Sequence, residues 1–399
     1  LYYENDSTTK ELYDMTSMER NFKFLFPVDG DVMVGEADGV KVDAGLKITV
    51  LVEAPFGSKI TVNKVPAKRL PDGNLGAEII LDGCFNRLEA KDRDTGAVRV
   101  ITVFVFEKAY RKYRFTVDDF IRGFQDIQEH RDTYGSIFEN SYLKIFKEAH
   151  DRYGSKVHIN VFYETEDRSF NLSMMTDRFY EEFTANASWL SFSFHARSES
   201  PDMPYLHKSC DRLKEDGLLV ETELRRFAGE AVLRDSTTLH WGATDICGAR
   251  VLRDLGYKAL CGYFTFFHGE DPYGCYYNGD PMVSYYLTKE QVAHMEHRCF
   301  WVDTQEDILF ARLHMVLNAQ ELAAHRVEGF LDGLAARPSE SGFIQMVIHE
   351  QHFYSDYIAF EPDYRERILT MARWMHQHGY HTASLSDLVG DKEINFMDP

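Results

Sequence analysis

The pattern of hydrophobic and polar residues changes once along the chain, near residue 108. Before that point, short alternating or β-branched runs are separated by turn residues such as those around Pro27, Gly57 and Gly73. Short strands at this spacing are typical of a β-sandwich. The sequence therefore predicts an immunoglobulin-like sandwich over residues 21–108, preceded by a polar arm at residues 1–20. The expected strands cover residues 23–26, 46–52, 59–62, 77–81 and 98–106.

After residue 108, helical and strand patterns alternate. Residues 141–153 place apolar side chains near one helical face, end at Gly154 and lead into an apolar strand at 156–162. Such alternation predicts an α/β domain, a parallel and incomplete (β/α) barrel over residues 109–399. The sandwich either extends a glycan-binding surface or serves as a packing platform for this domain. Further expected helices cover residues 177–186 and 320–335, and further strands cover 311–317 and 343–348.

The composition is that of a globular protein with room for two domains. Of its 399 residues, 44% are hydrophobic and 27% are charged. The formal net charge is -20 without a large Lys/Arg cluster, which argues against nucleic acid as a partner. No run approaches the roughly 18 apolar residues that a membrane span needs, so we expect no membrane partner.

The cysteines bear on the cellular compartment. All 6 lie outside any Cys-x-x-Cys pattern, which predicts neither a disulfide framework nor a thiolate zinc site. Cys84, Cys247 and Cys261 lie in apolar runs, and we expect them to be small core residues. No signal peptide is visible, although the chain starts at Leu1 and processing could have removed one. We therefore expect a cytoplasmic rather than a secreted protein. The sequence gives no indication of the oligomeric state.

Two adjacent carboxylates, Asp118 and Asp119, end a β-rich run over residues 112–120. Neighbouring side chains on a strand point to opposite sides and so meet different environments. One carboxylate could then bind a metal ion while the other accepts a proton. A solvated turn or a helix N-cap is the structural alternative.

Three histidines, His195, His240 and His349, each follow a short apolar or β-prone run. Catalytic groups collect at the carboxyl ends of parallel strands in α/β folds. An aspartate with two or three histidines there makes a site for Zn²⁺ or a similar divalent ion. Each histidine could instead be a hydrogen-bonded structural residue.

The order of these residues resembles the polysaccharide deacetylase family, the NodB-homology carbohydrate esterases. The family motif Thr-Phe-Asp-Asp-Gly appears here as Thr116-Val-Asp118-Asp119-Phe120. The resemblance implies that Asp118 is the general base and Asp119 a metal ligand. The final family motif, Leu-x-His, matches Met346-Val-Ile-His349 and implies that His349 is the general acid. The resemblance covers roughly residues 110–390.

Two other family motifs are altered. The motif His-Ser/Thr-x-x-His reads His195-Ala-Arg-Ser-Glu199, so a carboxylate stands where the second imidazole ligand is expected. Either Glu199 or His240 is therefore expected to complete the metal site. Arg226 is a candidate replacement for the family arginine that orients the base, with a surface ion pair as the alternative. Trp241 is a candidate for stacking on a sugar ring, with core packing as the alternative.

These residues together imply a metal-dependent hydrolase that removes an acyl group, in the first place acetyl, from a carbohydrate. The implied cofactor is a divalent ion, most simply Zn²⁺, bound by Asp119, His195 and His240. One alternative is another C–N hydrolase reaction on the same scaffold. The other is a glycan-binding protein that has kept the fold and lost catalysis. His352 and Glu350 follow His349 closely enough to reach the same cleft.

Overall fold

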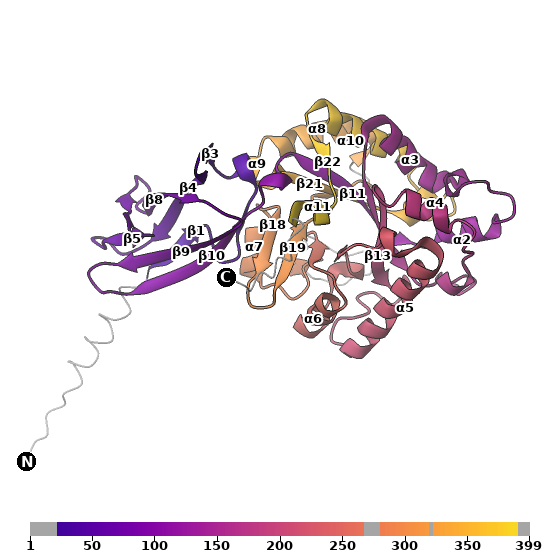
Figure 1. The fold of residues 1–399 in the computed structure, drawn as a ribbon, viewed down its shortest axis with the longest axis horizontal. Coiled ribbons are helices and arrows are strands. Elements are labelled where there is room, and N and C mark those ends of the chain that lie inside the picture. The colour runs from indigo at the N-terminus through magenta and orange to yellow at the C-terminus, as the bar shows by residue number, and fades with distance from the viewer. Residues whose placement is uncertain (1–21, 267–279, 319–321, 390–399) are drawn as a thin grey trace, which may run out of the picture. The chain divides into compact units, whose positions relative to one another are not determined.

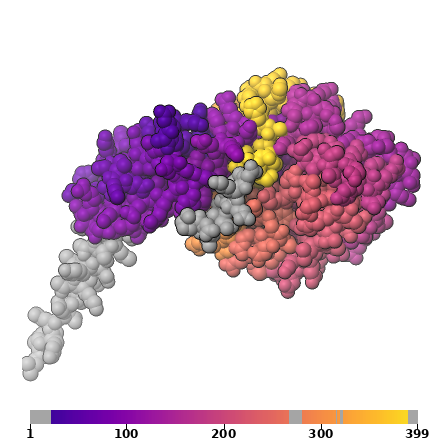
Figure 2. Space-filling view, viewed as in Figure 1, coloured from indigo at the N-terminus to yellow at the C-terminus, as the bar shows by residue number. Residues whose placement is uncertain are grey.

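The structure is a computed structural model that describes residues 22–266, 280–318 and 322–389. The chain divides into two compact units, the first ending at Glu107 and the second starting at Lys108. Each unit forms a compact body of its own (Figures 1 and 2). The polar arm expected at residues 1–20 lies outside the described residues.

The first unit consists of two five-stranded sheets that share one hydrophobic core. Strand pairs are antiparallel except for β2 with β10. Inward and outward side chains alternate, as in β9, where every second residue is buried. Val50, Leu88 and Val103 are fully buried in the shared core. The immunoglobulin-like type stays a prediction. One sheet contains β1 (Lys23–Phe26), β3 (Val40–Val42), β4 (Gly45–Glu53), β7 (Lys68–Arg69) and β8 (Leu75–Leu81), and the other β2 (Val32–Met33), β5 (Ile60–Val62), β6 (Val65–Pro66), β9 (Phe85–Asp92) and β10 (Val98–Val105).

The second unit is built on parallel strands, as the sequence predicted. The central strand β11 pairs with β12 on one side and with β21 on the other, all in parallel. In a second sheet, β15 pairs in parallel with β14 and β19, and β18 adds an antiparallel edge. The first sheet contains β11 (Lys112–Phe120), β12 (Val157–Phe162), β13 (Leu190–Ala196), β20 (Met315–Val316), β21 (Phe343–His349) and β22 (His381–Thr382), and the second β14 (Ser236–Thr237), β15 (Ala259–Gly262), β18 (Phe300–Asp303) and β19 (Ile308–Arg312).

Backbone hydrogen bonds connect these two sheets into a barrel-like ring (Figure 1). A bridge between Phe192 and Leu233 joins β13 to the segment that leads into β14. At the other junction, the N–H of Leu313 donates to the carbonyl of Gly262, and the N–H of His314 donates to that of Gln345. The carboxyl ends of the parallel strands therefore meet at one end of the ring. The mixed α/β class is confirmed, and the deacetylase type of barrel stays a prediction.

The longer helices, such as α3, α5, α8 and α10, lie outside the ring (Figure 1). In α3, the Asn140 side chain caps the first turn by accepting from the N–H of Leu143, and Gly154 ends the helix with φ +70°. This helix covers the residues that the sequence predicted. The helices are α2 (Arg122–Glu129), α3 (Ser141–Tyr153), α4 (Tyr180–Ala185), α5 (Cys210–Ala228), α6 (Ile246–Asp254), α7 (Lys289–Met295), α8 (Ala324–Ala335), α9 (Pro338–Ser341), α10 (Tyr364–Gln377) and α11 (Leu385–Val389), and a small hairpin pairs β16 (Thr265–Phe266) with β17 (Pro281–Met282).

The cysteine predictions were partly wrong. Cys210 and Cys247 form a disulfide that links the start of α5 to the first turn of α6. These helices pack against each other, so their cysteines meet only in the folded chain, across a separation of 37 residues that shows no motif. Cys84 is exposed, whereas Cys261 is buried as expected. The cysteines thus no longer favour a cytoplasmic location, which stays a prediction. Among the described helices, none is both long and apolar enough to cross a membrane.

Candidate active site

The end of β11 is distorted where the two aspartates lie. The pairing of β11 with β12 shifts register between Val117 and Phe120, and Asp119 adopts the left-handed conformation with φ +63°. Aspartate tolerates this conformation better than most residues. As a result, Asp118 and Asp119 both line one cavity. The expectation that they point to opposite sides of a regular strand was wrong, because the strand is not regular there.

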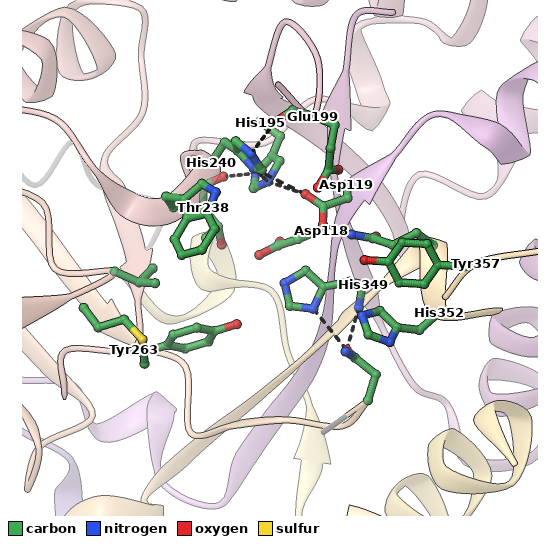
Figure 3. Close-up of a pocket in the computed structure, with 15 residues that line it drawn as sticks. Asp118, Asp119, His195, Glu199, Thr238, His240, Tyr263, His349, His352 and Tyr357 are labelled. Carbon is green, nitrogen blue, oxygen red and sulfur yellow. Dashed lines mark hydrogen bonds and ion pairs between the residues drawn. The ribbon is translucent and has the colours of Figure 1, made fainter. Parts of the chain in front are cut away.

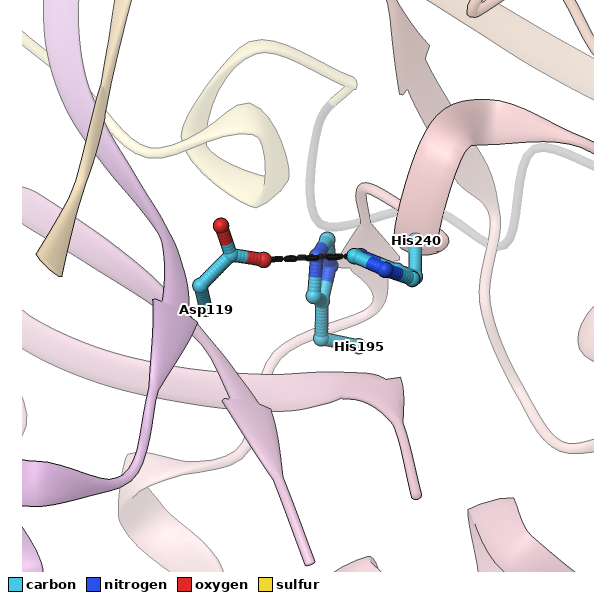
Figure 4. A group of neighbouring side chains, drawn as sticks. All are labelled: Asp119, His195 and His240. Atoms are coloured by element: carbon cyan, nitrogen blue, oxygen red, sulfur yellow. Dashed lines mark hydrogen bonds and ion pairs between the residues drawn. The ribbon is translucent and has the colours of Figure 1, made fainter. Parts of the chain in front are cut away.

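Three buried side chains bring one ligand atom each to a common point (Figure 4). Asp119 Oδ1 lies 3.0 Å from His195 Nε2 and 3.4 Å from His240 Nδ1. The two histidine nitrogens are 3.1 Å apart. These residues come from β11, from β13 and from the segment after β14, so the barrel assembles them from distant parts of the sequence.

The hydrogen bonds of the ring nitrogens that face away from Asp119 determine which nitrogen of each neutral imidazole carries the proton. The second nitrogen of His195, Nδ1, donates to the carbonyl of Thr238, and the second nitrogen of His240, Nε2, donates to the carbonyl of Glu199 at 3.0 Å. A neutral imidazole carries only one N–H, so both nitrogens that face Asp119 bear lone pairs. Gln351 Nε2 donates to the other carboxylate oxygen, Asp119 Oδ2, at 2.7 Å. With both rings neutral, three acceptor atoms face one another, and a shared cation, either a proton or a metal ion, would satisfy them.

The surroundings shift the pKa values of the two histidines in opposite directions. Burial and the hydrogen bond and charge of Asp119 oppose each other at both histidines. At His195 burial prevails and lowers the pKa, which keeps the imidazole neutral. At His240 burial is outweighed by Asp119, which raises the pKa. Although burial acts against its charge, the neighbouring histidines hold the pKa of Asp119 well below its usual range. The carboxylate is therefore ionised and attracts a cation.

The separations fit a divalent metal. Zinc binds histidine nitrogen and carboxylate oxygen at about 2.0–2.2 Å, so ligand atoms about 90–110° apart lie about 3.0–3.5 Å from each other. The three observed separations are 3.0, 3.1 and 3.4 Å. Two histidines and a carboxylate, each held by an outer hydrogen bond, form a common protein site for Zn²⁺ or a similar ion.

Asp118 lies beside this cluster, and His349 lies opposite it on the neighbouring strand (Figure 3). Asp118 is 3% exposed, and burial raises its pKa to about 7 although His349 lowers it. His349 Nδ1 donates to Asn318 Oδ1 at 3.0 Å, because an amide oxygen can only accept. Its Nε2 is thereby left for other partners. A proton acceptor and a potential proton donor thus line the same cavity.

Asn160 is a site residue that the sequence did not identify. Its Nδ2 donates to Asp118 Oδ1 at 2.6 Å, and its Oδ1 accepts from the backbone N–H of Thr238 at 3.1 Å. Because the Thr238 N–H can only donate, the orientation of the amide is fixed. The one available signal was an amide at the centre of the mainly apolar strand β12, which also contains His158.

Glu350 holds the backbone that carries the aspartates. Its carboxylate accepts from the backbone N–H groups of Ile121, Arg122 and Gly123 at 2.7, 2.9 and 2.6 Å. It thereby caps the start of α2 directly after β11 and does not line the cavity. His352, the other ambiguous candidate, lines the cavity, and burial together with His349 lowers its pKa to about 4.

The cavity has a volume of about 300 Å³, at the lower end for a small-molecule site. Aromatic rings and aliphatic side chains form part of its wall, and the Tyr263 hydroxyl is directed into it (Figure 3). Its described lining contains no lysine or arginine. The lining residues are Asp118, Asp119, His195, Glu199, Thr238, His240, Trp241, Tyr263, Met282, Val283, Asn318, His349, Gln351, His352 and Tyr357.

Two further predicted site residues, Trp241 and Glu199, lie at the cavity but differ in what they contact. Trp241 lines the cavity, next to His240. Glu199 also lines it, but its carboxylate is not part of the three-atom cluster, and its backbone carbonyl is what contacts His240. Burial and the charge of Asp119 raise the pKa of Glu199 to about 7.

Of the two interpretations of Arg226, the surface ion pair holds and the role in orienting the base does not. The side chain does not line the cavity and binds Glu223 at 2.6 Å and the carbonyls of Met175 and Leu172 at 2.8 and 2.9 Å. It is a structural residue on α5, and Asn160 is the group that orients Asp118. Sequence order alone could not distinguish an arginine that faces the cavity from one that faces a loop.

Comparisons with known proteins do not identify a family. No family model matches the chain, and no curated protein matches it. Matches among solved structures include a "putative alpha-galactosidase" from Bacteroides fragilis, with 10% identity, coverage of 89% of this chain and 78% of that one, and a TM-score of 0.25. A "putative alpha-galactosidase/melibiase" from the same organism has 10% identity, coverage of 60% and 56%, and a TM-score of 0.16. Amylomaltase from Corynebacterium glutamicum has 12% identity, coverage of 94% and 45%, and a TM-score of 0.15. Similarity this low carries no argument, so function is inferred from the site alone.

Proposed function

We propose that the protein is a metal-dependent hydrolase that removes an acyl group, in the first place acetyl, from a carbohydrate. The observation that carries the proposal is the convergence of Asp119 Oδ1, His195 Nε2 and His240 Nδ1, three buried atoms that need a shared cation. A proton acceptor, Asp118, and a histidine, His349, line the same cavity.

The residues divide the reaction between them. Asp119, His195 and His240 would hold the ion, most simply Zn²⁺, and a bound divalent ion supplies Lewis-acid chemistry that acidifies water and polarises a carbonyl. Asp118 accepts a proton from the attacking water, while Asn160 keeps its carboxylate in place. The water oxygen bonds to the acyl carbon, and the bond from that carbon to the sugar nitrogen or oxygen breaks. A protonated His349 donates its proton to the departing amine or alkoxide.

The cavity wall supports a carbohydrate substrate. Trp241, Tyr263 and Tyr357 offer aromatic surface on which the C–H face of a sugar ring can pack. Its described lining carries three carboxylates, those of Asp118, Asp119 and Glu199, and no cationic side chain other than histidine. A neutral or amino sugar therefore suits the cavity better than a polyanionic glycan.

The test is metal content by elemental mass spectrometry, on protein purified without chelator. We expect near-stoichiometric metal in the wild type and its loss in Asp119→Ala, His195→Ala and His240→Ala. Glu199→Gln is the matched control, since it changes a carboxylate of the same cavity outside the cluster, and it should keep the metal. Hydrolysis of acetylated sugars should disappear with the metal. A wild type that stays metal-free after reconstitution with Zn²⁺ would refute the proposal.

A further inference from the structure

The Tyr263 hydroxyl is directed into the cavity and has no hydrogen-bond partner among the described residues. Its side chain is half-buried and forms part of the cavity wall (Figure 3). The hydroxyl oxygen is not one of the unpaired polar atoms that are closed off from solvent, so a ligand in the cavity can reach it. A phenol hydroxyl that faces a cavity in this way is available to bind a ligand.

Neighbouring tyrosines show that this feature is specific to Tyr263. Tyr285 and Tyr286 follow the second strand of the same hairpin, and neither lines the cavity. The Tyr285 hydroxyl donates to the carbonyl of Cys261 at 2.8 Å, and the Tyr286 hydroxyl donates to Asp303 Oδ2 at 2.8 Å. Hydroxyls that face the protein interior are thus paired, whereas the hydroxyl that faces the cavity is left for a ligand.

The backbone is held on both sides of Tyr263. The carbonyl of Gly262 accepts from the N–H of Leu313 at 2.7 Å, and the N–H of Phe264 donates to the carbonyl of Val283 at 3.4 Å. Phe264 is fully buried in the core. The hydroxyl is carried by a rigid ring on this fixed backbone, so its position is set before a ligand arrives, as a group that stabilises a transition state requires.

The surroundings keep this hydroxyl a hydrogen-bond donor. Burial first, and then the charges of Asp118 and Asp119, raise the pKa of Tyr263 well above its usual range. The phenol therefore keeps its proton and can offer it to an acceptor. In the proposed reaction Asp118 serves the attacking water and His349 serves the departing atom. The acyl carbonyl oxygen is then the reacting atom to which no side chain has yet been assigned as a donor.

We infer that the Tyr263 hydroxyl donates a hydrogen bond to the carbonyl oxygen of the acyl group and, after hydrolysis, to a carboxylate oxygen of the acid product. This inference rests on the proposed function and makes Tyr263 a catalytic residue that touches the reacting atoms. The hydrogen bond strengthens as negative charge develops on that oxygen, so its loss should affect kcat more than KM.

Hydrolysis of p-nitrophenyl acetate by the full-length, zinc-loaded protein tests the inference. Because p-nitrophenolate departs without needing a proton, the rate reports on the carbonyl oxygen and not on His349. Tyr263→Phe keeps the ring and removes the hydroxyl, and we expect kcat to fall about 100-fold with little change in KM. A kcat within about twofold of wild type would overturn the inference. A loss seen with an N-acetylated sugar but not with this ester would also overturn it, because the hydroxyl would then serve the departing atom.

Tyr286→Phe is the matched control, since it removes the same hydroxyl from a tyrosine that does not line the cavity. The Tyr286 hydroxyl is hydrogen-bonded to Asp303, so its loss should lower the Tm by about 2–4 °C and leave kcat unchanged. Tyr263→Phe should show the opposite pattern, with a Tm within about 2 °C of wild type, because no hydrogen bond of the fold is lost. A Tm of Tyr263→Phe that falls by several degrees together with kcat would show a structural role and overturn the inference.

A binding measurement distinguishes failure of the inference from failure of the proposed function. Fluoroacetate, observed by ¹⁹F NMR, presents the negatively charged oxygens of an acid product. We expect Tyr263→Phe to weaken its binding about tenfold and Tyr286→Phe to leave it unchanged. If no acetylated substrate is hydrolysed, the proposed function fails, and this binding difference alone decides on Tyr263. Equal binding to wild type and Tyr263→Phe, or none to wild type, would overturn the inference.

Discussion

Glu350 does not line the cavity, yet we expect its carboxylate to contribute strongly to the free energy of unfolding. Its carboxylate is 1% exposed and accepts three backbone N–H groups, of which those of Ile121 and Gly123 are buried. A fourth hydrogen bond comes from the Tyr354 hydroxyl at 2.9 Å. Among the described residues, these N–H groups have no other acceptor, so removing the carboxylate leaves them without partners.

The expected loss of stability follows from the two buried N–H groups that would lose their acceptor. Each buried donor left unsatisfied costs about 1–3 kcal/mol, so Glu350→Ala should lower the free energy of unfolding by about 4 kcal/mol. Glu350→Gln keeps one acceptor oxygen and should cost about half as much. Tyr354→Phe removes only the fourth hydrogen bond and should cost about 1 kcal/mol.

Urea unfolding followed by tryptophan fluorescence measures these differences. All 4 tryptophans lie in the second unit, at positions 189, 241, 301 and 374, so the signal reports the unit that contains Glu350. The denaturant slope should stay constant across the series. A loss below about 1 kcal/mol in Glu350→Ala would refute the reasoning, because it would mean that the N–H groups find other partners.

Three further predictions concern other parts of the second unit. The pKa of Asp118 is raised from 3.8 to about 7 by burial, so the folded state binds the extra proton and stability should fall as pH rises across that window; Asp118→Asn should remove this slope in Tm measured against pH and abolish turnover while metal content is kept. Arg226→Ala should lower the Tm, because two loop carbonyls lose their donor, and a change in kcat greater than twofold would return Arg226 to the site. Reduction of the Cys210–Cys247 disulfide should destabilise the second unit by about 4 kcal/mol in the chain-entropy model, and Cys210→Ser with Cys247→Ser should show the same loss and no further response to reductant.

Much of the fold could be predicted because its signals are local. The β-rich run before Asp118, the helix that ends at Gly154 and the strand that ends at His349 each have a clear period and a clear end. Histidines and aspartates at strand ends could be grouped because parallel strands bring their carboxyl ends together.

The details of the site depend on the fold and could not be predicted. Neither the left-handed turn at Asp119 nor the pairing of Cys210 with Cys247 leaves a local pattern. Arg226 and Asn160 show the same limit, since what each contacts is decided by elements distant in sequence. Glu199 contributes through its backbone, which no residue pattern reveals.

The last residue of β21 and the two residues that follow it act on three different parts of the site. His349 faces Asp118 across paired strands, Glu350 holds the start of α2, and Gln351 binds Asp119. An insertion or deletion of one residue here would move all three side chains to new positions, so the three contacts would be lost together. An engineer who transfers the site to another barrel should therefore move this tripeptide together with the end of β11, as a single cassette.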